Sequence, residues 1–100
     1  MLDDFHLWIE QNRYEIEKHD FAIEILEVKD GAKPSINLYL TRIDKMVRIS
    51  IWKTSEIDIE ILNSKTEQCE IYKYWEEIQT AELVNVLNKL LHELVLPVLN

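Results

Sequence analysis

Acidic residues alternate with isoleucines in one short segment of the chain. The segment reads Glu56-Ile57-Asp58-Ile59-Glu60-Ile61. Side chains of a β-strand point alternately to its two faces, so one face would carry three carboxylates and the other would carry three isoleucines. We call Glu56, Asp58 and Glu60 the acidic row. Acids two residues apart lie about 6.5–7 Å apart at Cα, which permits a glycosidase-type pair. A regular exposed row, however, provides nothing that would raise the pKa of one acid above that of another, as a general acid requires. The simpler interpretation of the row is a solvated outer face of the sheet.

Other arrangements that carry chemistry are not found in the sequence. The three histidines, His6, His19 and His92, have no metal-ligand spacing with one another or with Cys69. Cys69 is the only cysteine, and we expect it to face the core as a small apolar residue. No serine stands in a nucleophile elbow, and a single glycine excludes a phosphate-binding loop. We therefore expect no enzyme, no metal site and no cofactor.

The acidic row has neighbours that favour protein binding. The preceding strand would place Arg48, Ser50 and Trp52 on the same face, and aromatic anchors among polar groups dominate interface energies. Trp52 could instead pack under a loop or a helix. A row of carboxylates resembles a phosphate backbone and suits the Lys/Arg groove of a basic nuclease or RNA-binding protein. The residues expected to contact such a partner are Arg48, Trp52, Glu56, Asp58, Glu60, Tyr72, Tyr74, Glu76 and Glu77.

Length and charge restrict the class of protein. One hundred residues with 47% hydrophobic composition predict a single domain over 1–100. A net charge of −8 opposes direct binding to nucleic acid or to anionic membranes. The first residues lack the basic and apolar regions of a signal peptide, and no apolar stretch reaches the ~20 residues of a membrane span. We expect a cytoplasmic protein.

The apolar pattern predicts the elements that position these residues. A helical period runs to about Lys18, with Asp3 or Asp4 as its N-cap. A second helix has Thr80 as its predicted N-cap and ends at Pro97. The phase reverses at Ile25-Leu26, which predicts a bulge or a strand buried on both faces. Period-two alternation predicts strands at 21–28, 36–41, 47–52, 56–62 and 67–75, although the last helix could begin before Glu76. The predicted fold is α+β, with a single antiparallel meander of four to five strands and both helices packed on one face.

The two ends of the chain and the meander between them resemble a known family. The chain opens Leu2-Asp3-Asp4-Phe5-His6-Leu7-Trp8-Ile9 and closes Ala81-Glu82-Leu83-Val84-Asn85-Val86-Leu87. It resembles the immunity proteins of bacterial contact-dependent growth inhibition, and within them the type that neutralises a tRNA-cleaving toxin acting with elongation factor Tu. The resemblance implies a cytoplasmic antitoxin that binds a cognate toxin domain and masks its active site or RNA groove. A monomer within a 1:1 complex is expected, with elongation factor Tu in a larger assembly.

Two other functions agree with the composition. A secretion chaperone is also small, acidic and α+β, but it is an obligate dimer with a large apolar interface. The dimer face expected for such a chaperone is the last helix, whose apolar residues are Leu83, Val84, Leu87, Leu90, Leu91 and Leu94. The other function is a small hydrolase that uses the acidic row, which would be tested by Asp58→Asn once turnover had been observed.

Overall fold

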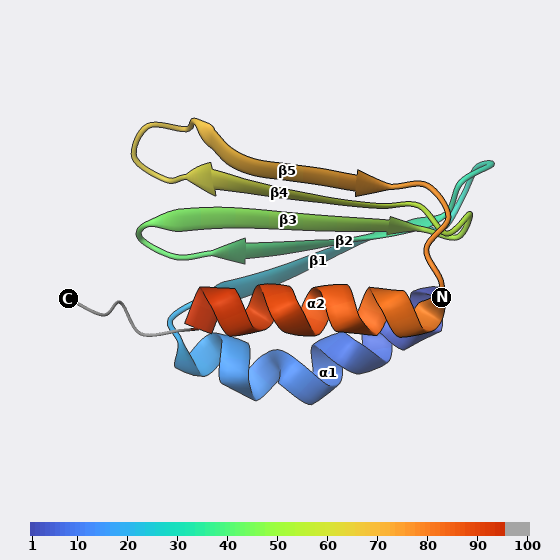
Figure 1. The fold of residues 1–100 in the computed structure, drawn as a ribbon, viewed down its shortest axis with the longest axis horizontal. Helices are drawn as coiled ribbons and strands as arrows, with labels where there is room; N and C mark the ends of the chain where they lie inside the picture. The colour runs from blue at the N-terminus through green and yellow to red at the C-terminus, as the bar shows by residue number, and fades with distance from the viewer. Residues whose placement is uncertain (96–100) are drawn as a thin grey trace.

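The computed structural model describes residues 1–95 of the chain. Its elements in order are α1 (Leu2–Lys18), β1 (Ala22–Val28), β2 (Ser35–Thr41), β3 (Lys45–Trp52), β4 (Ile57–Asn63), β5 (Cys69–Trp75) and α2 (Thr80–Val95). The strands form one antiparallel sheet in the order β1-β2-β3-β4-β5, and both helices lie on the same side of it (Figure 1). The predicted α+β meander is confirmed, with β5 as a true fifth strand.

The core lies between the sheet and the two helices. The three central strands each contribute alternate side chains to it, and the register aligns these side chains across the sheet: Leu38 pairs with Ile49, which pairs with Ile59. The helices contribute the residues at helical spacing, namely Phe5, Trp8, Ile9, Ile16, Leu83, Leu87, Leu90, Leu91 and Leu94. The apolar residues of α2 are thus largely covered within one chain. None of the helices in residues 1–95 is long and apolar enough to cross a membrane.

The two helices run in the same direction (Figure 1). Polar contacts join them. Trp8 of α1 is 4% exposed, its ring stacks on Phe5 at a centroid distance of 6.4 Å, and its Nε1 donates to Asn88 Oδ1 of α2 at 2.8 Å. This hydrogen bond satisfies the one polar atom of a buried indole and so offsets the cost of removing that atom from water.

Arg42, between β2 and β3, joins the C-terminal ends of both helices. Its Nη1 lies 3.4 Å from the carbonyl oxygens of both His19 and Leu94, and its guanidinium lies 4.3 Å from the centre of the Phe21 ring. Asp44 pairs with Arg42 at 2.6 Å, and this hydrogen bond lowers the pKa of Asp44. A cation at these positions satisfies carbonyls that have no partner within their helices and offsets the negative ends of the helix dipoles.

The predictions for β1 and for the start of α1 were wrong. β1 pairs with β2 in unbroken register without a bulge, and it is mostly exposed at the edge of the sheet. The register shift lies instead between Ile61 and Leu62, where β4 pairs with β5. α1 begins at Leu2 after Met1, and neither Asp3 nor Asp4 caps it through a side-chain hydrogen bond. Both aspartates lie in the first turn, where a negative charge interacts favourably with the positive end of the helix dipole.

Two further predictions concern the later part of the chain. Cys69 was predicted to face the core, but it is exposed because β5 is an edge strand and the register shift lies beside it. The predicted end of the last helix at Pro97 lies outside the described residues. Thr80 was predicted to be the N-cap of that helix, but it is the first helical residue. Leu83 N–H donates to the Gln79 carbonyl at 2.9 Å, so Gln79 occupies the cap position.

Candidate binding face

The sheet face opposite the helices, which we call the outer face, gathers most of the predicted partner-binding residues. Two rows cross the three strands β3, β4 and β5. Ser50, Asp58 and Tyr74 pair in one row, and Arg48, Glu60 and Tyr72 pair in the next. Trp52 ends β3, and Glu56 stands just before β4 beside it. Alternation along each strand therefore brings together all the predicted residues except Glu76 and Glu77.

Glu56 is held by three contacts. Lys33 Nζ lies 2.6 Å from Glu56 Oε1, Tyr74 donates its hydroxyl hydrogen to Oε2 at 2.7 Å, and Thr54 donates to Oε1 at 2.8 Å. These bonds favour the ionised carboxylate and lower the pKa of Glu56 from 4.5 to about 2. The same contact raises the pKa of Tyr74 to about 12, because the phenol donates to a carboxylate. The carboxylate and the ring are thus fixed relative to each other.

Asp58 is not the exposed carboxylate that the sequence predicted. It is only 7% exposed, its Oδ2 lies 3.5 Å from Arg48 Nη2, and Tyr72 donates to the same oxygen at 3.4 Å. Its Oδ1 and the Nε of Arg48 are buried without a hydrogen-bond partner among the described residues. A buried pair that leaves polar atoms unsatisfied regains little of its desolvation cost. Asp58 therefore serves mainly to orient Arg48 and Tyr72, and the acidic row is not an open ridge of three charges.

Glu60 is the member of the acidic row that remains available. Within residues 1–95 it forms no hydrogen bond or ion pair, although it pairs in register with Arg48. Beside it is a depression of about 130 Å³ lined in part by Tyr39, Met46 and Leu62. The depression offers apolar walls next to the Glu60 carboxylate and the Arg48 side chain, an arrangement that suits the aliphatic part of a long side chain.

The aromatic residues of the outer face are accessible. Tyr72 is 55% exposed and Tyr74 is 45% exposed. Trp52 is half-buried, and the Lys33 ammonium, rather than a helix, lies over its ring at 5.5 Å from the centroid. Rings of this kind, ordered but open on one side, are typical of interface anchors.

The remaining predicted residues, Glu76 and Glu77, are exposed in the segment that joins β5 to α2. The negative charge of Glu76 is a minor contribution to the raised pKa of Tyr74. Sequence reasoning missed Lys33, which lies in the loop before β2. Pairing of Ser35 with Trp52 brings that loop beside the Trp52 ring and beside Glu56. The register of β2 against β3 was therefore the signal that would have located Lys33.

The fixed contacts of Glu56 give a testable titration. A depressed folded-state pKa means that these contacts stabilise the fold above pH ~4.5 and lose that effect as the pH falls through about 2. Lys33→Met should raise the pKa of Glu56 most, because Lys33 contributes most to the shift, and Tyr74→Phe should raise it less. NMR titration of the Glu56 carboxyl carbon measures both changes. If the pKa of Glu56 is unchanged in both variants, Lys33 and Tyr74 do not contact its carboxylate as described.

Comparison with protein families gives one match and one negative result. The family model described as "Immunity protein TriTu" matches residues 3–93, which include most of α1, all five strands and most of α2. No curated protein matches the chain. Because the match covers nearly the whole chain, the chain belongs to the TriTu family of immunity proteins, and its role is that of an antitoxin with a cognate toxin as its partner.

Proposed function

We propose that this immunity protein neutralises a basic tRNA-cleaving toxin domain by binding it through the outer face and covering its active site or RNA groove. The observation that carries the proposal is the outer face itself. No element within residues 1–95 covers Tyr72 and Tyr74, and their hydroxyls are bonded to carboxylates that hold them in place. A surface ordered before binding loses less side-chain entropy when the partner arrives.

Charge and aromatic area have separate roles in this proposal. The net charge of −8 draws a basic domain toward the protein and speeds association. Glu60 and the exposed Glu76 and Glu77 supply carboxylates for the lysines or arginines of the toxin. The burial of Trp52, Tyr72 and Tyr74 supplies most of the affinity, because desolvated aromatic anchors dominate binding energies.

The complex that we propose is 1:1 and forms in the cytoplasm, with elongation factor Tu as a further component when the toxin acts through it. Burial of Leu83, Leu87 and Leu91 within one chain supports a monomeric antitoxin over a dimeric chaperone. Inhibition without catalysis is supported by the acidic row. Its contacts lower the pKa of Glu56 to about 2, whereas a general acid needs a raised pKa.

Inhibition should be stoichiometric. The toxin domain encoded by the reading frame immediately upstream is mixed with transfer RNA and with increasing amounts of this protein, and cleavage is followed on a gel. Cleavage should stop at one equivalent, because a tight 1:1 complex occludes the site. Cleavage that continues at a fivefold excess of this protein would remove the proposal for that toxin.

A charge variant tests the contribution of the outer face in the same assay. Glu56→Gln with Glu60→Gln removes two charges from the face and leaves the buried Asp58 paired with Arg48. The association rate and its dependence on salt should both fall. The matched control, Glu10→Gln with Glu17→Gln on α1, removes the same charge from the far side and should change the association rate less.

A further inference from the structure

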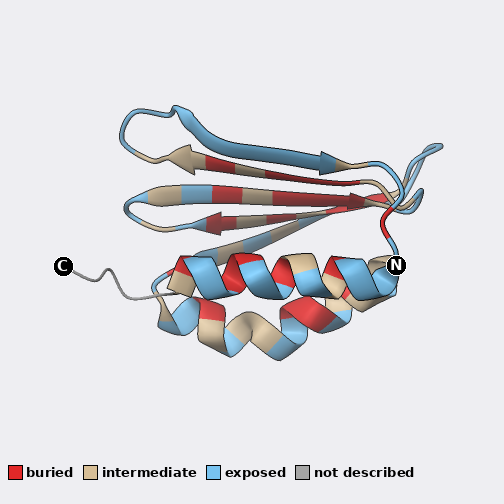
Figure 2. Cartoon of the chain, viewed as in Figure 1, coloured by how far each residue is buried: buried red, intermediate tan, exposed pale blue. Residues whose placement is uncertain are grey.

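β5 is an open edge of the sheet. It pairs with β4 along one side only, and every residue of the strand except Trp75 is exposed, as its uniform pale blue colour shows (Figure 2). The backbone N–H and C=O groups of an edge strand that point away from the sheet have no partner within the sheet and form a template for a further strand. β1 is the other edge, but on its inner side Glu27 is bonded to His6 of α1 at 2.9 Å. The inner side of β1 is therefore engaged by a contact with α1.

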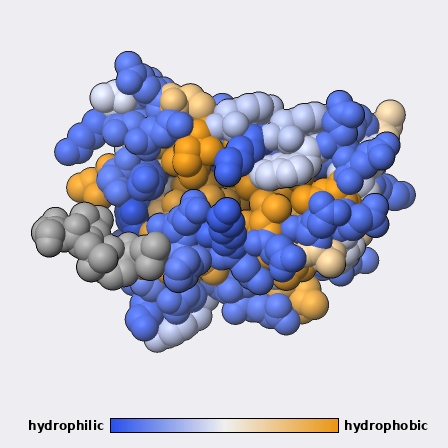
Figure 3. Space-filling model, in the orientation of Figure 1, coloured by the Kyte–Doolittle hydropathy of each residue, from blue (hydrophilic) through white to orange (hydrophobic). Residues whose placement is uncertain are grey.

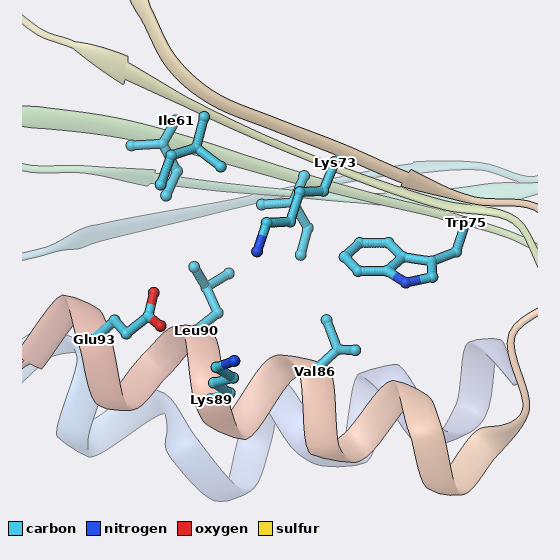
Figure 4. Close-up of a pocket in the computed structure, with 9 residues that line it drawn as sticks. Ile61, Lys73, Trp75, Val86, Lys89, Leu90 and Glu93 are labelled. Carbon is cyan, nitrogen blue, oxygen red and sulfur yellow. The ribbon is translucent and has the colours of Figure 1, made fainter.

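An apolar groove lies directly beneath the β5 edge. It separates β5 from α2, has a volume of about 140 Å³, and appears as a hydrophobic strip with hydrophilic borders (Figure 3). Its apolar lining comes from both layers and comprises Ile59, Ile61, Ile71, Trp75, Val86 and Leu90. Lys73 extends from β5 into the space above α2, where Lys89 and Glu93 stand at the rim (Figure 4).

We propose that β5 receives an extended segment of the cognate toxin, which joins the sheet as a sixth strand and places alternate side chains in this groove. The inference rests on the proposed function only for the identity of the partner as a toxin domain. Backbone hydrogen bonds to β5 provide affinity, and the groove selects the side chains. Outward side chains of the added strand would lie beside Tyr72 and Tyr74, so the edge and the outer face form one continuous surface.

The inner side chains of β5 specify what the added strand must carry. Ile71, Lys73 and Trp75 point toward the helices, because they pair with the core residues Ile61, Ile59 and Ile57. Within residues 1–95, Lys73 forms no ion pair, and the groove that it lines is mostly apolar. A carboxylate opposite Lys73, with apolar residues two positions before and after it, would fill the groove and pair the ammonium. The toxin segment should therefore read apolar–x–acidic–x–apolar.

The charge of Lys73 also favours a toxin segment over a second copy of this chain as the strand that pairs with β5. An inward-pointing lysine is one of the devices by which edge strands avoid self-pairing. A second β5 strand would bring another lysine and no carboxylate into the groove. A partner that brings an acid turns the same charge into a favourable contact, and this complementarity favours the toxin segment as the occupant.

Hydrogen–deuterium exchange of the complex with the upstream-encoded toxin domain, together with binding assays of Lys73→Glu, tests the inference. Amides of β5 should become protected at alternate residues in the complex. Lys73→Glu should weaken binding at least tenfold, whereas Lys18→Glu, the same charge change at an exposed site on α1, should not. A toxin variant with lysine in place of the acidic residue of its own protected segment should restore binding to Lys73→Glu.

The outcomes separate this inference from the proposed function. Full inhibition of tRNA cleavage with no protection of β5 would overturn the added strand and leave the proposed function standing. Protection of β5 by a bound toxin that does not cleave transfer RNA would support the added strand and overturn the tRNase assignment. A free protein that sediments as a dimer, and becomes a monomer on Lys73→Glu, would identify a second copy as the occupant and overturn the inference.

Discussion

Trp52→Ala is expected to weaken toxin binding by about 2–4 kcal/mol, a loss typical of an aromatic hot spot. The ring is half-buried on the outer face and is ordered by the Lys33 ammonium at 5.5 Å. It lies outside the core between sheet and helices, so its removal should lower the free energy of unfolding by less than it lowers the binding free energy. Calorimetry of toxin binding and urea unfolding of the same variant measure the two quantities.

A conservative variant tests how much of the binding energy depends on the apolar area of the Trp52 ring. Trp52→Phe retains part of the apolar surface and should lose a fraction of the binding energy that Trp52→Ala loses. If Trp52→Ala instead lowers stability by several kcal/mol and leaves the affinity of the folded protein unchanged, Trp52 is a structural residue. The interface must then lie elsewhere, for instance along β5.

Trp8→Ala is expected to lower the free energy of unfolding by about 3–5 kcal/mol, the range for large-to-small changes at buried aromatic residues. The ring is 4% exposed, stacks on Phe5, and donates to Asn88 Oδ1 at 2.8 Å. Its removal leaves a cavity at the contact between α1 and α2 and an amide without its partner. Chemical denaturation followed by far-UV circular dichroism gives the value. Circular dichroism is chosen over fluorescence because the variant's tryptophan fluorescence comes only from Trp52 and Trp75 and is not comparable with that of the wild type.

The partner of the indole provides the control for Trp8→Ala. Asn88→Ala removes only the hydrogen bond and should cost about 1 kcal/mol. Neither variant changes a residue of the outer face or of the groove beside β5, so the folded fraction should bind the toxin with wild-type affinity. Equal losses of stability in the two variants would mean that the hydrogen bond, and not the packing of the ring, holds the helices together.

Periodicity in the sequence was enough to predict the fold and the composition of the outer face. Isoleucines at 57, 59 and 61 had to face the core, and this placed Asp58 and Glu60 on the opposite side of the sheet. Short turns between strands restricted the sheet to a meander, and the meander brought Arg48 opposite Glu60. Local alternation and nearest-neighbour pairing carry this information, and both can be read from the chain.

Alternation does not predict how deeply an outward side chain is buried. Asp58 points outward, yet Arg48 and Tyr72, the side chains of neighbouring strands, contact it and it is buried. Cys69 alternates like a core residue, but it belongs to the last strand of the sheet and is exposed. The contact of Lys33 with Glu56 depends on how a loop folds over the end of a strand. Such features arise from the position of a strand in the sheet and from long side chains, which a local pattern does not encode.

The contacts of Arg42 mean that the last turns of the two helices should fray together. One guanidinium serves the terminal carbonyls of both α1 and α2, so opening of either end also frees part of the donor that holds the other. Because both helices point the same way, their like-signed ends meet at Arg42 and would repel each other without it. The end of the molecule at Arg42 is thus a single cooperative unit in local unfolding, in which amides near residues 16–19 should exchange in step with those near residues 92–95.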